Sequence, residues 1–363
     1  GMEKRETPTY RRSEAFPIVR EECRAVRSRV GVYETSNYGK YEVTGAGARA
    51  WLDRIFACRI PRPGRLALAP MLNEAGRLVG DLSIACLAED RFFIVGSGFA
   101  EEFHLRWFWQ MQPPENVFVR SVSSTLCGLS IAGPLSRELL QPLTRTDLSN
   151  DAFKLFDVRE TSIGYAPVIL TRAGFTGELG YEVWTTPDFF VALHEEICDA
   201  GERLGLVHFG GRALSSLRLE KNYGSFNRDF RPDYTPGQTG LDRFVAFNKG
   251  DFVGRAAATR PCEQALRPGR AVTVNARTNG IENRDADHFT RACRQIGVAK
   301  FRNPVRKFAG RCGNGATIHI HLQPPQGGAR AKCVPARVGY CMCALRPCHL
   351  TGRKERATLR IFT

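Results

Sequence analysis

The chain has 363 residues and a formal net charge of +15, and its fractions of hydrophobic (43%) and charged (25%) residues are those of a globular protein with its own apolar core. No apolar run approaches the ~20 residues that a membrane-spanning helix needs, which argues against a membrane protein. The N-terminal segment, GMEKRETPTYRRSEAF, is charged and does not resemble a secretory signal, so we expect a cytoplasmic protein with reduced thiols.

The first part of the sequence predicts short strands joined by tight turns, with helices between them. Residues 31–45, GVYETSNYGKYEVTG, read as a turn-rich entry into a strand over KYEV. The spacing of Trp51, Ile55 and Phe56 predicts a helix in ARAWLDRIF. The run LALAPMLNEAGRLVGDLSIACLAEDRFFIVGSG predicts several strands with turns at NEAGR and AED, and EEFHLRWFWQM predicts a short amphipathic helix.

The middle of the sequence continues the same mixture. We expect strands in VFVRSVSSTLCGLSIAGP and helices in PLSRELLQPL and DFFVALHEEICDAGERLGL, the last of them ending near Gly205. Antiparallel strands with segregated helices favour an α+β fold over a doubly wound parallel sheet.

A glycine-rich turn at residues 43–50, VTGAGARA, approaches the fingerprint of dinucleotide-binding proteins. That fingerprint also needs an acidic residue ~20 positions further on, which binds the ribose hydroxyls. No Asp or Glu lies between Asp53 and Glu74. We therefore interpret the glycines as a tight turn into a helix.

Asp81 is the only carboxylate in GRLVGDLSIACL (76–87), where Leu78, Val79, Leu82 and Ile84 surround it. A carboxylate in an apolar strand is costly unless it is hydrogen-bonded, paired or used in chemistry. Two interpretations stay open at this point. Asp81 is either a functional group or an ordinary exposed strand or turn residue after Gly80.

The stretch TRAGFTGELGYEVW (171–184) reads as the turn of a hairpin between VILTR and YEVW. Strand alternation places Tyr181 and Val183 on one face and Glu182 on the other. A glutamate beside a glycine turn can accept two N–H donors from a planar heterocycle such as a pterin, and Phe175 and Tyr181 could cover such a ring. The alternative is an exposed strand glutamate, which is common.

The basic charge lies almost wholly in the last hundred residues. Residues 262–363 contain 15 Arg and 4 Lys against 5 acidic residues, a net charge of +14, and 7 of the 12 cysteines; residues 1–261 contain 33 basic and 32 acidic residues. Three interpretations stay open: a divergent basic domain, a metal-binding tail, and a stretch whose reading frame has shifted. The run CMCALRPCH (341–349) does not match the ligand spacing of zinc fingers or ribbons, so we expect no metal.

Five motifs, taken in order, resemble the folate-dependent aminomethyltransferases, which the glycine-cleavage T-protein typifies. They are GVYETSNYGKYEVTG, MLNEAGRLVGDLSI, GFTGELGYEVW, ALSSLRLEKNYG and TGLDRFVAFNKGDFVGRAA, and they cover most of residues 20–257. The resemblance is closer still to the folate-binding half of dimethylglycine and sarcosine dehydrogenases. It implies antiparallel sheets with packed helices, a folate-binding region over residues 1–260 built from two interleaved subdomains, and a separate region over 261–363 that does not resemble the C-terminal β-barrel of the family.

The resemblance also implies roles for four residues. Asp81 matches the catalytic aspartate of the family, and Glu182 matches the glutamate that holds the pterin ring of tetrahydrofolate. Phe175 stands where many members have a tyrosine, and Tyr223 matches an aromatic residue near the same pocket. Two departures favour the amine-dehydrogenase branch. Leu214 replaces an arginine that is usual in T-proteins, and Leu68 replaces a tyrosine that commonly precedes the MLN motif.

The function that the resemblance implies is one-carbon transfer from an amine donor to tetrahydrofolate, yielding methylene-tetrahydrofolate. The donor would be a small methylated amine or a carrier-bound aminomethyl group, and a separate flavoprotein would carry out any oxidation. The alternative within the fold is a non-catalytic folate-binding accessory protein, although such proteins carry a cysteine where this chain has Asp251. A second alternative, nucleic-acid binding through the basic tail, predicts steeply salt-dependent binding. We expect neither a nucleic-acid nor a membrane partner.

Overall fold

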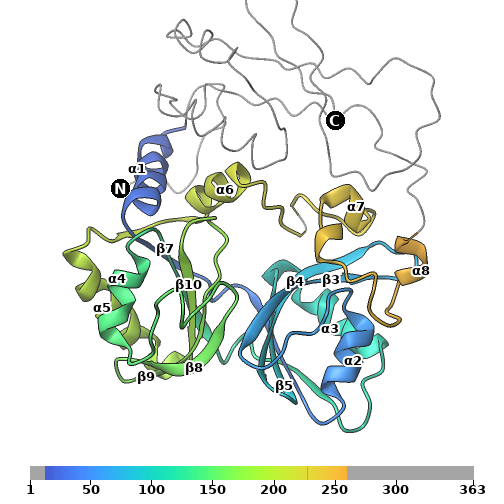
Figure 1. Cartoon of the computed structure of the whole chain (residues 1–363). Helices are drawn as coiled ribbons and strands as arrows, with labels where there is room; N and C mark the ends of the chain where they lie inside the picture. Colours follow the sequence, from blue (N-terminus) through green and yellow to red (C-terminus); the bar gives the residue numbers. More distant parts are fainter. Residues whose placement is uncertain (1–12, 227, 260–363) are drawn as a thin grey trace, which may run out of the picture. The chain divides into compact units, whose positions relative to one another are not determined.

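The computed structural model describes residues 13–226 and 228–259, and all but the first of them belong to one compact unit, residues 14–262 (Figure 1). Two antiparallel-type sheets with packed helices confirm the α+β prediction. Within this part of the chain no helix is long and apolar enough to cross a bilayer. The predictions for residues 261–363, including the basic charge and the CMCALRPCH run, fall outside the described residues.

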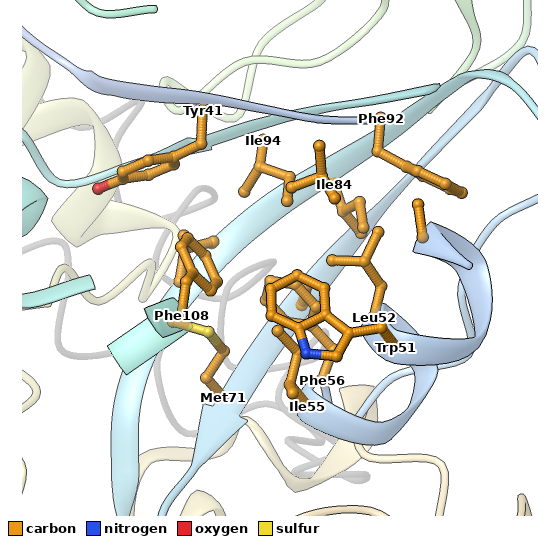
Figure 2. Close-up of a cluster of buried hydrophobic side chains, with 14 of the residues drawn as sticks. Tyr41, Trp51, Leu52, Ile55, Phe56, Met71, Ile84, Phe92, Ile94 and Phe108 are labelled. Atoms are coloured by element: carbon orange, nitrogen blue, oxygen red, sulfur yellow. The ribbon is translucent and has the colours of Figure 1, made fainter. Parts of the chain in front are cut away.

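The first sheet has five strands in the order β3-β4-β5-β2-β6, and every neighbouring pair is antiparallel. Its strands are β2 (Gly39–Thr44), β3 (Arg65–Leu72), β4 (Leu78–Ala88), β5 (Arg91–Gly96) and β6 (Phe118–Ser121). Helices α2 (Ala48–Ile55) and α3 (Glu101–Gln110) supply apolar side chains to its core. Figure 2 shows Trp51 and Leu52 from α2 and Phe108 from α3 facing the strand residues Ile84 and Ile94.

The second sheet has six strands in the order β11-β1-β7-β10-β9-β8. Its strands are β1 (Gly31–Glu34), β7 (Cys127–Ala132), β8 (Val158–Ile163), β9 (Ala166–Thr171), β10 (Gly180–Thr185) and β11 (Val207–His208). The pair β1–β11 is parallel and the others are antiparallel. Helices α4 (Ser136–Leu140) and α5 (Pro187–Glu202) pack on this sheet, whereas α1 (Phe16–Ser28) packs against α6 (Gly211–Glu220) (Figure 1).

Backbone and apolar contacts join the two sheets between the start of β3 and the start of β8. The Leu66 amide donates to the Phe156 carbonyl (2.7 Å) and the Val158 amide donates to the Gly64 carbonyl (3.0 Å). Trp184 of β10 packs edge-on against Phe93 of β5, with ring centroids 5.6 Å apart. The two halves of the described chain therefore share an apolar cluster and do not depend on surface contacts alone.

The segment after α6 folds back onto the first sheet. It contains two short helices, α7 (Pro236–Thr239) and α8 (Arg255–Ala258), and its Phe226, Phe230 and Phe252 pack against Leu72 and Leu78. Lys249 anchors the segment, because its buried ammonium donates to Asp53 Oδ1 (3.0 Å) and to the carbonyls of Phe56 and Cys58 (2.8 Å each). This packing explains how the lysine side chain can be buried at this point of the chain.

Most of the predicted elements are confirmed, including the hairpin of β9 and β10, the turns at NEAGR and AED, and the helix after the glycines of residues 43–50. Gly45 has φ +117 in that turn, so the glycine-rich stretch is a turn into α2 and not the opening of a parallel βαβ unit. Several elements differ from the prediction. GVYE (31–34) is strand β1 and not a turn, and helices α1, α6, α7 and α8 and strands β8 and β11 were not predicted.

Candidate folate site

Asp81 lies on β4, directly across from Pro70 of the edge strand β3, and its side chain is half-buried. Burial raises the pKa of this carboxyl to about 7, and the nearby carboxylate of Asp229 also raises it. Hydrogen bonds from two backbone N–H groups, those of Asp81 itself and of Phe226, lower the pKa. Asp81 is therefore not a fully exposed strand residue. A carboxyl with this pKa can both accept and release a proton near neutral pH.

Arg218 of α6 organises the residues that surround Asp81. Its guanidinium is only 5% exposed and donates to Asp229 Oδ2 (2.7 Å) and to the carbonyl of Tyr223 (2.8 Å). Asp229 also accepts a hydrogen bond from the Ser225 amide (2.9 Å). One buried cation thus fixes the course of the chain from Tyr223 to Asp229, and with it the Phe226 amide that faces Asp81.

Phe175 and Tyr223 come together as the resemblance implies. Their rings are stacked, with centroids 6.2 Å apart and planes at 15°. The Arg218 guanidinium lies over the Phe175 ring, 5.8 Å from its centroid, so the aromatic pair and the ion pair with Asp229 share one arginine. At the outer end of the same hairpin, Glu178 forms an ion pair with Lys221 (3.4 Å), and both side chains are partly exposed.

Glu182 lies in the middle of β10, between Ser130 of β7 and Thr171 of β9. Its neighbours Tyr181 and Val183 enter the core, which confirms the predicted alternation, while Glu182 points to the other face and is half-buried. Burial raises the pKa of this carboxyl to about 7, and a hydrogen bond from the Thr171 side chain opposes the rise. A further N–H donor that bonds to the ionised carboxylate would favour the ionised form and lower the pKa of Glu182.

Tyr38 is a member of this neighbourhood that the sequence reasoning did not identify. Burial raises its pKa well above the usual range, and the nearby Glu182 carboxylate raises it further, whereas Arg228 lowers it. Arg218, Asp229 and Tyr38 were missed for the same reason. Each is unremarkable in its own sequence context, and only the folded chain brings residues 38, 182, 218 and 228–229 together.

The four predicted residues thus fall into two groups. In the first, Phe175 and Tyr223 stack on each other, and Arg218 pairs with Asp229, whose charge raises the pKa of Asp81. In the second, the charges of Glu182 and Arg228 both act on the pKa of Tyr38. Two hollows of the described residues lie elsewhere. One, of about 900 Å³, is lined by β6 and the end of α3; the other, of about 450 Å³, is lined by β1 and His208. The roles of the four residues remain predictions.

The two positions that depart from T-proteins carry apolar side chains, one packed and one exposed. Leu214 of α6 packs against the cluster formed with α1, and Leu68 of β3 is 36% exposed. Neither position carries a polar group that could reach a ligand.

Comparison with known proteins agrees with this fold. The family described as GCVT N-terminal domain matches residues 3–249. An aminomethyltransferase of Halothermothrix orenii is 31% identical over 253 residues, covering 69% of this chain and 70% of that protein. The mitochondrial dimethylglycine dehydrogenase of Rattus norvegicus is 32% identical over 285 residues, covering 78% of this chain but only 33% of that protein. The chain therefore spans about a third of the length of the dimethylglycine dehydrogenases that it matches.

The solved structures point to the same fold. The glycine cleavage system aminomethyltransferase T of Bartonella henselae superimposes with a TM-score of 0.60 at 24% identity, over 66% of this chain and 65% of that chain. The relatives matched by sequence are named as aminomethyltransferases and dimethylglycine dehydrogenases, which are enzymes. This chain belongs to the GCVT N-terminal domain family.

Proposed function

We propose that this chain catalyses one-carbon transfer from an amine donor to tetrahydrofolate. Two observations carry the proposal. Burial raises the pKa of two half-buried carboxyls, Asp81 and Glu182, to about 7, and the rings of Phe175 and Tyr223 are stacked. Tetrahydrofolate would supply the nucleophilic nitrogen that takes up the carbon. The residues present suit it, because they offer a hydrogen-bond acceptor and an aromatic wall for a flat heterocycle.

Glu182 would recognise the pterin ring. Its carboxylate can accept two N–H donors side by side, and such bonds to an ionised acceptor are about twice as strong as neutral ones. Because these donors favour the ionised form, binding should release a proton from Glu182 near pH 7. Phe175 and Tyr223 would line the ligand, and Arg218 would hold both through its contacts with the Phe175 ring and the Tyr223 carbonyl.

Asp81 would act at the reacting atoms. As a carboxylate it would stabilise positive charge that develops at the transferring carbon, and with a pKa of about 7 it could take up the proton that the attacking nitrogen loses. Burial raises this pKa most, and the Phe226 amide and the Asp229 carboxylate adjust it in opposite directions, so the segment that carries them contributes to the acidity of Asp81.

The donor would be a methylated amine or a carrier-bound aminomethyl group. The similarity to dimethylglycine dehydrogenases favours a methylated glycine, with a separate flavoprotein carrying out the oxidation that precedes transfer. Non-catalytic folate binding is the alternative. Both uses need the ligand to bind at Glu182, and they differ in the need for Asp81.

The test is a fluorescence titration of the full chain with reduced tetrahydrofolate, followed by an assay for methylene-tetrahydrofolate with candidate amine donors. Glu182→Gln should weaken binding at least about tenfold, since a charge-assisted pair of hydrogen bonds is lost. Glu178→Gln is the matched control, because Glu178 is on the same hairpin but pairs with Lys221.

Asp81→Asn separates the two uses of the site. Under the proposal it keeps tetrahydrofolate binding and loses turnover by a factor of roughly 10²–10⁴. Asp90→Asn, in the exposed turn between β4 and β5, is the control and should change neither property. If the wild type binds tetrahydrofolate but turns over none of the donors, only the folate-binding use of the site would remain. If Glu182→Gln binds tetrahydrofolate as tightly as the wild type, Glu182 does not recognise the pterin ring.

A further inference from the structure

A cluster of three potential metal ligands lies on α5 and β11, which carry none of the residues of the candidate folate site. His194 and Cys198 are four residues apart on α5, so their side chains emerge on the same face of the helix. His208 belongs to β11, the edge strand that pairs with β1. Gly205 ends the helical region with φ +63, and the Leu206 amide donates to the Gly201 carbonyl (3.1 Å), so the chain reverses and β11 returns to α5.

The three side chains converge on one point. His194 Nε2 and His208 Nε2 are 2.9 Å apart, and Cys198 Sγ lies 3.6 Å from the first nitrogen and 3.7 Å from the second. One ligand atom from each residue falls within 4.8 Å of the others. Two imidazoles and a thiol are ligand types that zinc binds in proteins, and here their ligand atoms lie close together.

These separations can be compared with what a metal ion requires. Zinc binds imidazole nitrogen at about 2.0–2.1 Å and thiolate sulfur at about 2.3 Å, so tetrahedral angles place N and S about 3.6 Å apart and two nitrogens about 3.4 Å apart. The two N–S distances already agree with this geometry. The N–N distance needs to open by roughly 0.5 Å, which a small rotation of the exposed His208 ring would supply.

We propose that His194, Cys198 and His208 form a zinc-binding site with an open fourth position. Two borderline imidazoles and one soft thiolate form a donor set that suits Zn²⁺ and disfavours Mg²⁺ or Ca²⁺, which prefer oxygen. His208 is exposed and also lines the hollow of about 450 Å³ beside β1, so water or a small ligand can reach the fourth position. On binding, the Cys198 thiol loses its proton to solvent and the imidazoles bind as neutral rings.

The sequence did not reveal this site because the ligands do not form a recognisable spacing. Cysteine and histidine at i and i+4 are common on helices, and the third ligand comes from a two-residue strand whose position depends on the turn at Gly205. The cysteine- and histidine-rich run that does stand out in the sequence, CMCALRPCH, lies outside the described residues.

The chain has 12 cysteines, so the total amount of bound zinc would not identify the site, and a measurement resolved by residue is needed. The full chain is treated with N-ethylmaleimide with and without Zn²⁺, and the modification of each cysteine is followed by peptide mass spectrometry. Zinc should slow the alkylation of Cys198 at least about tenfold, because a coordinated thiolate is not a free nucleophile. Cys127, which is also half-exposed, is the internal control and should react at the same rate in both conditions.

Two substitutions complete the test. His208→Asn and His194→Asn should each abolish the protection of Cys198, and excess EDTA should reverse it in the wild type. Magnesium in place of zinc should give none. Equal alkylation of Cys198 with and without zinc in the wild type would overturn the proposal, and that comparison needs no variant to fold. Protection that survives both histidine substitutions would also overturn it, since the metal would then be held by other groups.

Discussion

Asp81 and Glu182 are carboxyls held in surroundings that favour the protonated form, and this has a consequence for stability as well as for chemistry. The pKa of Asp81 is about 7 in the folded chain and 3.8 as the ordinary value. Between these values the folded state keeps a proton that the unfolded state has lost. The contribution of Asp81 to stability is therefore lost as the pH rises from about 4 to about 7, because ionisation is harder in the folded protein.

Asp81→Asn removes this dependence, since the amide has the same shape and no charge to bury. We expect the variant to be more stable than the wild type at pH 8 by roughly 1–2 kcal/mol, a value reduced to allow for the partial solvent access of the site, and to differ much less at pH 5. Urea unfolding at the two pH values measures this. A difference between variant and wild type that does not change with pH would show that Asp81 is not held in its protonated form.

The sequence indicated the two acidic residues but not the residues that surround and position them. Asp81 was visible because a single carboxylate interrupts an apolar strand, and Glu182 because it alternates with core residues beside a glycine turn. Arg218 and Asp229 are eleven positions apart in a segment with no periodic pattern, so their pairing depends on how the chain after α6 turns back. The resemblance, and not the residue pattern, supplied Tyr223.

Turns between elements also position the site. The turn of residues 73–77, which leads into β4 and Asp81, lies against the start of α8. The Gly254 residue before that helix has φ +81, and an added Cβ would collide with the Asn73 carbonyl oxygen. Gly76, in the turn itself, faces the Ala258 amide, which an added Cβ would approach to 2.7 Å.

Three glycine substitutions separate the causes of this constraint. Gly254→Ala should lower the free energy of unfolding by roughly 2–4 kcal/mol, because both its positive φ and the collision oppose a side chain. Gly240→Ala, with φ +72 and open space around it, should cost only about 1 kcal/mol. Gly237→Ala, in α7 and also in open space, should be neutral or slightly stabilising. Denaturant unfolding of the three variants gives the comparison, and equal losses at positions 254 and 240 would refute the contact with Asn73.

The prediction of elements succeeded where alternation was long and failed where it was short. β4 has eleven residues, and it and the hairpin of β9 and β10 contain enough buried positions for the apolar pattern to be recognised in the sequence. β1 has only four residues, and both strands that pair with it, β7 and β11, are distant in sequence. Helix α1 has a strong apolar face but lies among many charged residues, and its packing partner α6 follows almost two hundred positions later.

For the described chain as a whole, the candidate site depends on both sheets at once. Asp81 comes from the first sheet and Glu182 from the second, and the chain between Tyr223 and Asp229 contacts the surroundings of each. Arg218 fixes that chain from α6. Arg218 therefore holds the segment beside both acids, in addition to the backbone and apolar contacts that join the two sheets.

Replacing Arg218 should therefore affect binding and turnover together. Arg218→Gln leaves Asp229 without its cation and the Tyr223 carbonyl without its donor, so we expect a loss of roughly 2–4 kcal/mol in stability. Under conditions where the variant stays folded, tetrahydrofolate affinity should fall at least about tenfold and turnover by a further factor, on the order of 100 for a displacement of about 1 Å. Glu220→Gln, on the same helix, breaks only an exposed ion pair with Arg27 and should cost less than about 1 kcal/mol. Binding titrations and unfolding curves of both variants decide the matter. An Arg218→Gln protein that is destabilised yet binds and turns over normally would mean that the two sheets hold the site in place without this arginine.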